Sequence, residues 1–80
     1  MTLSINQCRA ARALLDWTIT DLAQAASVGV MTVKRFEAGQ SVSAVSIQAL
    51  SDAFYKAGIS FVTAGEVSTG GGEGVRFTEA

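Results

Sequence analysis

The 80-residue sequence contains no histidine and only one cysteine, Cys8. Without histidine, the most common side chain for acid–base catalysis is missing, and Cys8 has no histidine to activate it as a nucleophile. A single cysteine cannot form an internal disulfide, and a structural zinc site lacks its usual ligands. We therefore expect no enzymatic activity, no metal and no cofactor.

Long apolar runs are also missing. No stretch of 18 apolar residues exists, so we expect no membrane-spanning segment. Residues 1–4 lack the basic start and apolar stretch of a signal peptide. One unpaired thiol fits a reducing compartment. These features predict a cytoplasmic protein with no membrane partner and no evident small-molecule substrate.

The composition is that of one small globular domain. Apolar residue types make up 49% of the sequence and charged types 16%, which is too apolar for a disordered chain. A domain of this size without a disulfide or a metal is often stabilised by oligomerisation. The formal net charge is −1, yet residues 1–40 carry four basic against three acidic side chains. An anionic partner is therefore expected at the N-terminal half.

Local signals predict four amphipathic helices. Ser4 and Thr18 each stand three residues before a Gln or an Asp, which is the pattern of a capping box at a helix start. Apolar residues then recur at helical spacing, and Gly39 and Gly58 stand where C-terminal caps belong. The helices are predicted over about residues 5–15, 19–26, 30–38 and 44–57.

The composition changes after the fourth predicted helix. Two runs rich in β-branched and aromatic residues, 59–64 and 75–77, flank a segment of mostly Gly, Ser, Thr and Glu. One interpretation is a frayed tail, and the other is two short strands around a loop. Because an isolated pair of strands is marginal in water, ordered strands are expected to pair with those of a second copy.

The second and third predicted helices form a helix-turn-helix pattern. They are short, and a turn of about three residues that contains Gly29 separates them. The helix over 30–38 turns its apolar residues inward and carries Lys34 and Arg35, the only adjacent basic pair, on its outer side. In a helix-turn-helix protein, this second helix enters the DNA major groove. The alternative is the solvated face of an ordinary amphipathic helix.

Two charged residues point toward the apolar core. Arg12 falls inside the apolar arc of the first predicted helix, and Glu37 lies at the edge of the apolar side of the third. Since breaking a buried pair costs about 3–5 kcal/mol, such charges need partners. We expect Arg12 and Glu37 to pair and to hold the third helix against the first. Cys8 is expected to be buried and inert, and Trp17 to pack at the core edge rather than on a base.

Three segments carry a family resemblance: 16–23 (DWTITDLA), 26–28 (ASV) and 32–39 (TVKRFEAG). In this order and spacing they resemble the Xre family of lambda-repressor-like helix-turn-helix transcription regulators, over residues 5–58. The residues after the fourth helix look like those of small bacterial members that end in a β segment. The resemblance implies a mainly α fold, a compact bundle of four or five helices followed by two short strands.

The resemblance also implies functional positions. The residues that match DNA-binding positions of the family are Thr18, Val30, Met31, Thr32, Lys34, Arg35 and Gln40. Arg12 and Glu37 match a conserved ion pair of the family. Ile19 departs from the pattern, because most relatives carry a phosphate-binding Gln there. The third helix also opens with apolar residues, which cannot make paired hydrogen bonds to G or A. We therefore expect modest affinity per subunit, with specificity that depends on Lys34, Arg35 and DNA shape.

These observations predict a small transcription regulator, a repressor, that binds double-stranded DNA sequence-specifically. Residues 1–58 are predicted to be the DNA-binding domain, and residues 59–80 to join two copies as a homodimer. The alternative is a protein-interaction module or an antitoxin, in which the bundle is a scaffold and the strands bind a protein partner. The acidic isoelectric point and the apolar start of the third helix favour this alternative.

Overall fold

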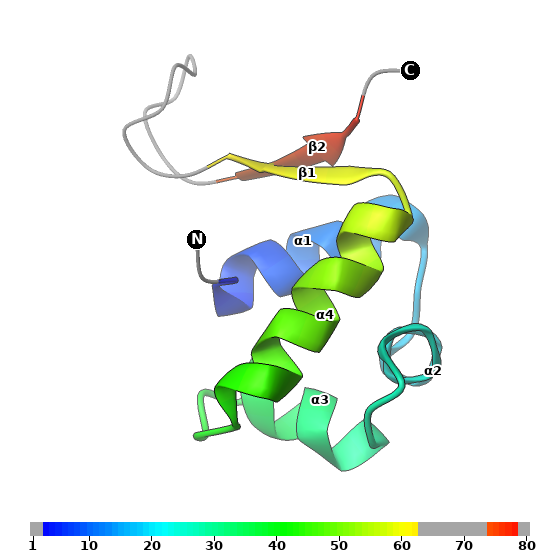
Figure 1. Cartoon of the computed structure of the whole chain (residues 1–80). Helices are drawn as coiled ribbons and strands as arrows, with labels where there is room; N and C mark the ends of the chain where they lie inside the picture. The colour runs from blue at the N-terminus through cyan, green and yellow to red at the C-terminus, as the bar shows by residue number, and fades with distance from the viewer. Residues whose placement is uncertain (1–2, 63–73, 79–80) are drawn as a thin grey trace.

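The computed structural model describes residues 3–62 and 74–78, which form four helices and a two-stranded antiparallel sheet (Figure 1). In chain order they are α1 (Ile5–Leu15), α2 (Ile19–Ala26), α3 (Val30–Glu37), α4 (Ala44–Lys56), β1 (Ile59–Val62) and β2 (Gly74–Phe77). This mainly α architecture confirms the predicted fold class. None of the four helices has the length and apolar character that crossing a membrane requires.

The helices begin where the sequence signals place them. The Ser4 hydroxyl accepts a hydrogen bond from the Gln7 N–H at 3.0 Å, and the Gln7 side chain accepts one from the Ser4 N–H at 3.1 Å. Thr18 and Asp21 make the same reciprocal pair at the start of α2, at 3.1 and 2.9 Å. α3 and α4 end one residue earlier than predicted. Of the run predicted as a strand over 59–64, residues 63–64 lie outside the described part.

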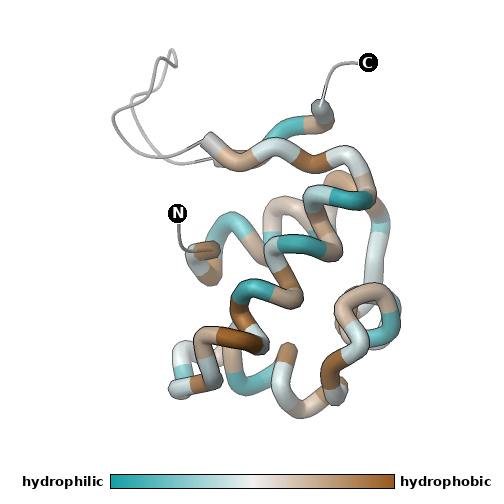
Figure 2. Tube along the Cα trace, viewed as in Figure 1, coloured by the Kyte–Doolittle hydropathy of each residue, from teal (hydrophilic) through white to brown (hydrophobic). Residues whose placement is uncertain are grey.

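One core unites the helices and the first strand. Hydrophilic and hydrophobic residues alternate in short blocks along α4, as expected for a helix with one buried face (Figure 2). The buried apolar residues are Leu3, Cys8, Ala11, Leu22, Ala23, Val33, Phe36, Leu50, Ala53, Phe54 and Ile59. This core anchors every element that positions α3.

Aromatic contacts tie α4 to the segment before α2. The fully buried Phe54 stacks against Trp17 with ring centroids 5.9 Å apart and meets Phe61 edge-on at 6.0 Å. Trp17 is partly buried and packs against the core, as its position before a helix start predicted. The Trp17 ring therefore packs against the protein's own core.

The two strands pack onto the helical bundle. β1 and β2 pair antiparallel, with Ile59 opposite Phe77 and Val62 opposite Gly74. β2 lies against α1 and β1 against α4, and Ile59 is fully buried in the common core. The strands lie at one end of the molecule and α3 lies at the other (Figure 1). A partner bound along the strands would therefore leave α3 open.

Candidate nucleic-acid interface

The connection between α2 and α3 is a tight three-residue turn. Ser27 adopts a left-handed conformation with φ of 56°, and the Val28 N–H donates to the Ala23 carbonyl at 3.0 Å. Gly29 is extended and forms the N-cap of α3 without a side-chain hydrogen bond. Because α2 and α3 also pack against each other, the turn fixes α3 at one angle to α2.

α3 divides into a buried and an exposed side. Val33, Phe36 and Glu37 are buried, whereas Lys34 and Arg35 are exposed. Within residues 3–62 and 74–78, no ion pair or hydrogen bond engages the Lys34 or Arg35 side chain. The two cations are therefore available to an anionic partner.

The remaining predicted α3 residues form the start of the same helix. Met31 is 56% exposed, and Val30 and Thr32 are partly buried. The first turn of α3 contains no acidic residue, so no carboxylate in that turn neutralises the positive end of the helix dipole. The structure thus gathers five of the predicted DNA-binding residues on one short helix.

The other two predicted residues lie at helix ends. Thr18 is exposed at the N-cap of α2. Its hydroxyl accepts a hydrogen bond from the Asp21 N–H, and the Asp21 carboxylate accepts one from the Thr18 N–H. Gln40 is exposed just beyond α3, and its N–H donates to the Arg35 carbonyl at 2.9 Å. The Asp21 carboxylate beside Thr18 partly offsets the positive end of the α2 helix dipole, which reduces the attraction of this helix start for a phosphate.

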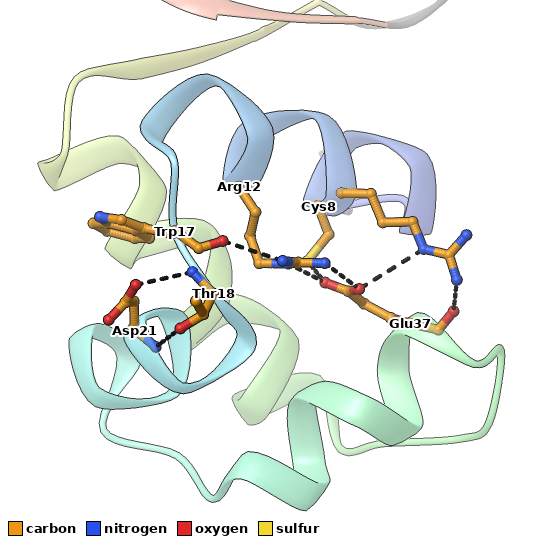
Figure 3. Close-up of polar contacts among 7 residues, drawn as sticks. Cys8, Arg12, Trp17, Thr18, Asp21 and Glu37 are labelled. Carbon is orange, nitrogen blue, oxygen red and sulfur yellow. Dashed lines mark hydrogen bonds and ion pairs between the residues drawn. The ribbon is translucent and has the colours of Figure 1, made fainter.

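A charge pair joins α1 to the buried side of α3 (Figure 3). The Arg12 Nε and Nη2 donate to the two carboxylate oxygens of Glu37 at 2.7 and 2.9 Å. The third guanidinium nitrogen, Nη1, donates to the Trp17 carbonyl at 3.1 Å. Arg12 is thus held by two partners, and through Glu37 it anchors α3 with a two-pronged bond of defined direction.

Two further α1 residues meet Glu37, and sequence reasoning did not identify their role. The Cys8 Sγ donates to a Glu37 carboxylate oxygen at 3.3 Å. The Arg9 Nη2 donates to the main-chain carbonyl of Glu37 at 3.0 Å, and its Nε lies 3.7 Å from the carboxylate. Arg9 precedes Arg12 by three residues, so both emerge from neighbouring turns on one side of α1. That spacing was the signal in the sequence that could have placed Arg9 beside Arg12 in this cluster.

The cluster shifts the ionisation of its members in opposite directions. Burial, together with the neighbouring Glu37 carboxylate, raises the pKa of the Cys8 thiol to about 12. Burial alone would raise the pKa of Glu37, but hydrogen bonds from Arg12 and Cys8 and the charges of Arg12 and Arg9 outweigh it, so the pKa is lowered. The hydrogen bond to Glu37 raises the pKa of Arg12. At neutral pH the site holds a charged pair and a protonated thiol.

The comparison with family models identifies this arrangement. A helix-turn-helix family model, HTH_3, matches residues 9–54, which is more than half of the chain and includes α2, the turn and α3. The chain belongs to the Xre/lambda-repressor-like helix-turn-helix family. This is a family of DNA-binding domains, so the molecule is a DNA-binding helix-turn-helix protein. A search of curated proteins found no match.

Proposed function

We propose that this helix-turn-helix protein is a sequence-specific transcription regulator of the cytoplasm that binds double-stranded DNA with α3 in the major groove. The observation that carries the proposal is the exposed Lys34–Arg35 pair on a helix whose opposite side is buried. A rigid helix with free cations on one side suits the width of the major groove. Occupation of a promoter by such a domain is the simplest route to regulation, and we propose repression.

The residues of α3 suggest how bases are distinguished. An arginine such as Arg35 can donate two hydrogen bonds to the O6 and N7 of guanine, and Lys34 can donate to the same edge. The exposed Met31 and the partly buried Val30 offer apolar contact to a thymine methyl group. Since only two cations and Thr32 supply polar contacts from α3, each subunit is expected to bind with modest affinity.

Thr18 and Gln40 are proposed to contact the DNA backbone on either side of α3. Both are exposed, and they lie at the start of α2 and just beyond the end of α3. The Thr18 hydroxyl accepts a hydrogen bond from Asp21, so its own proton remains free to donate to a phosphate. Such contacts set the register of α3 on the duplex but do not read the sequence.

Binding to selected DNA tests the proposal. Double-stranded oligonucleotides selected from a random pool, with low-salt and high-salt washes, give the preferred site. Replacing Lys34 or Arg35 by Ala should each weaken binding to that site by about 1–3 kcal/mol. Lys56→Ala, which removes an exposed charge at the far end of α4, is the matched control and should leave affinity nearly unchanged. Unchanged affinity in both α3 variants would remove the assigned role.

A homodimer is the second part of the proposal. The Thr78 N–H donates to the Gly58 carbonyl, and with Ile59 opposite Phe77 this pattern turns the main-chain polar groups of Val75 and Phe77 away from β1. An open strand edge pairs readily with another strand. Phe77 is also 50% exposed beside that edge. Two copies joined there could present two α3 helices about 34 Å apart to a palindromic site.

Sedimentation of point variants tests the dimer while preserving the core. Phe77→Ser should shift the sedimenting mass from dimer to monomer, because it removes apolar surface at the open edge. Tyr55→Ser, which changes a 73% exposed aromatic residue on α4, is the control and should remain dimeric. A Phe77→Ser variant with an unchanged dimer dissociation constant would show that β2 is not the interface.

The outer edge of β2, with which no strand of the described part of the chain pairs, also supports the alternative function, a protein-interaction module or antitoxin. An extended segment of another protein could add to β2 by main-chain hydrogen bonds. Affinity purification from cells at low salt separates the two proposals. Tight recovery of one protein without enrichment of any DNA sequence would favour the alternative, whereas an enriched DNA sequence favours the regulator.

A further inference from the structure

The C-terminus of α3 has a complete set of hydrogen-bond partners. The last four carbonyls of a helix have no partner within it, so the following turn or a side chain must supply donors. The Ala38 N–H continues the helical pattern, and Gly39, with φ of +84°, turns the chain so that two more of these carbonyls are reached. The N–H groups of Ala38, Gly39 and Gln40 donate to the carbonyls of Lys34, Phe36 and Arg35 at 3.0, 3.1 and 2.9 Å, respectively.

The fourth carbonyl, that of Glu37, takes its hydrogen bond from another helix. The Arg9 Nη2, which comes from α1, donates to it at 3.0 Å. The same guanidinium lies 3.7 Å from the Glu37 carboxylate through its Nε. A cation at this position also interacts favourably with the negative end of the helix dipole. Arg9 therefore closes the end of α3 from the side of α1.

We infer that Arg9 is a positioning residue for DNA recognition, because it ties the last turn of α3 to α1 and so fixes the direction in which Lys34 and Arg35 leave the helix. This inference rests on the proposed DNA-binding function. Arg9 acts through the α3 main chain and needs no contact with DNA itself.

Arg9 and Arg12 hold Glu37 at different points. Arg12 binds the carboxylate at the end of a flexible side chain, whereas Arg9 binds the main chain of the helix directly. Val33 and Phe36 hold α3 on the core, but with the Glu37 carboxylate alone bound to α1 the last turn of α3 can still shift about the bonds of that side chain. A second bond to the main chain removes that freedom. Two anchors from neighbouring turns of α1 thus restrain the last turn of α3 more tightly than the carboxylate pair alone.

The exposure of Arg9 separates its role in orientation from a role in stability. Its side chain is 59% exposed, compared with 20% for Arg12. Exposed charge pairs contribute little to the free energy of unfolding. Removing Arg9 should therefore leave the fold and its thermal midpoint nearly unchanged while altering the precision of DNA recognition.

A direct contact between Arg9 and a DNA phosphate is the competing explanation, and salt dependence distinguishes the two. Loss of one phosphate contact lowers the slope of log K against log salt by about 0.9 and weakens specific and non-specific binding alike. Loss of a positioning residue leaves the slope unchanged and weakens only binding to the selected sequence, because the base contacts alone depend on the orientation of α3.

The experiment compares Arg9→Ala and Arg9→Lys with the wild-type protein, with Lys56→Ala as the control for loss of one positive charge. Arg9→Ala should bind the selected site about tenfold more weakly, on the order of one lost base contact, with unchanged non-specific affinity and salt slope. Arg9→Lys should recover part of this loss, since an ammonium group can still donate to the Glu37 carbonyl. Wild-type specificity in Arg9→Ala, or a salt slope lower by about one, would overturn the inference.

An NMR measurement without DNA tests the tie itself. The Ala38 amide nitrogen shares a peptide bond with the Glu37 carbonyl, so its chemical shift should change in Arg9→Ala and not in Lys56→Ala. No change at Ala38 would overturn the inference whatever the DNA result. If the wild-type protein selects no DNA sequence while Ala38 does shift, the proposed function fails but the tie between α1 and α3 stands.

Discussion

Replacing Arg12 by methionine should destabilise the protein severely. The substitution keeps an unbranched side chain but removes the guanidinium. Among residues 3–62 and 74–78, the Glu37 carboxylate, which is 7% exposed in the wild type, then keeps the Cys8 thiol at 3.3 Å and Arg9 Nε at 3.7 Å. Breaking a buried ion pair costs about 3–5 kcal/mol. Because the Arg12 side chain is itself 20% exposed, we expect about 3 kcal/mol. Native proteins have a free energy of unfolding of roughly 0.05–0.15 kcal/mol per residue, so a loss of about 3 kcal/mol is a large part of the stability of this chain.

Removing the other partner of the pair, by Glu37→Leu, should lower the free energy of unfolding by less. It leaves Arg12 with its hydrogen bond to the Trp17 carbonyl at 3.1 Å and with partial access to water, so we expect about 2 kcal/mol. The double variant Arg12→Met/Glu37→Leu buries no unpaired charge. It should therefore be no less stable than Arg12→Met alone, with a coupling energy of at least about 2 kcal/mol.

Urea unfolding followed by far-UV circular dichroism at pH 7 gives the four free energies of this cycle. Arg35→Met is the control, because Arg35 is exposed and its change should stay within about 0.5 kcal/mol. A loss below about 1 kcal/mol in Arg12→Met, together with a coupling energy below about 0.5 kcal/mol, would refute the view that this pair anchors α3.

Three further predictions concern backbone strain and pH. Gly39→Ala places an L side chain at φ of +84° and should lower the free energy of unfolding by about 1–2 kcal/mol, measured as a lower urea midpoint. Ser27→Gly relieves a left-handed conformation at φ of 56° and should raise the thermal midpoint, with a gain of at most about 1 kcal/mol. Since folding lowers the pKa of Glu37 from its ordinary value of 4.5, the stabilisation is present above that pH and is lost progressively as the pH falls from there through the lowered pKa. Urea unfolding between pH 7 and pH 3 should show a steeper acid loss for the wild type than for Glu37→Leu.

Helix starts could be predicted to the residue because their signals are local. The Ser4 and Thr18 capping boxes involve residues only three positions apart, and both form as predicted. Helix ends were less precise, since α3 and α4 stop one residue short of the predicted limit. The strand register could not be predicted, because Ile59 and Phe77 are paired by contacts between segments distant in the sequence.

The candidate site was also predictable only where its signals are local in the sequence. Arg12 and Glu37 stood out as charges on apolar helix faces, and such charges need partners. Arg9 gave no such signal, because it lies outside the apolar arc, and its bond to the Glu37 carbonyl depends on how α1 packs against α3. The DNA-binding assignments combined an outward-facing helix side with a family resemblance. The outward side follows from periodicity, whereas the individual contacts depend on the bound DNA.

Cys8 is a built-in chemical probe for local opening of the helical bundle. Thiol reagents react with the thiolate, and the folded protein keeps its sole cysteine buried with a pKa of about 12. Labelling by an alkylating or disulfide reagent must therefore wait for α1 to separate from α3. The labelling rate reports how often the contact between α1 and α3 opens, in untagged protein of wild-type sequence.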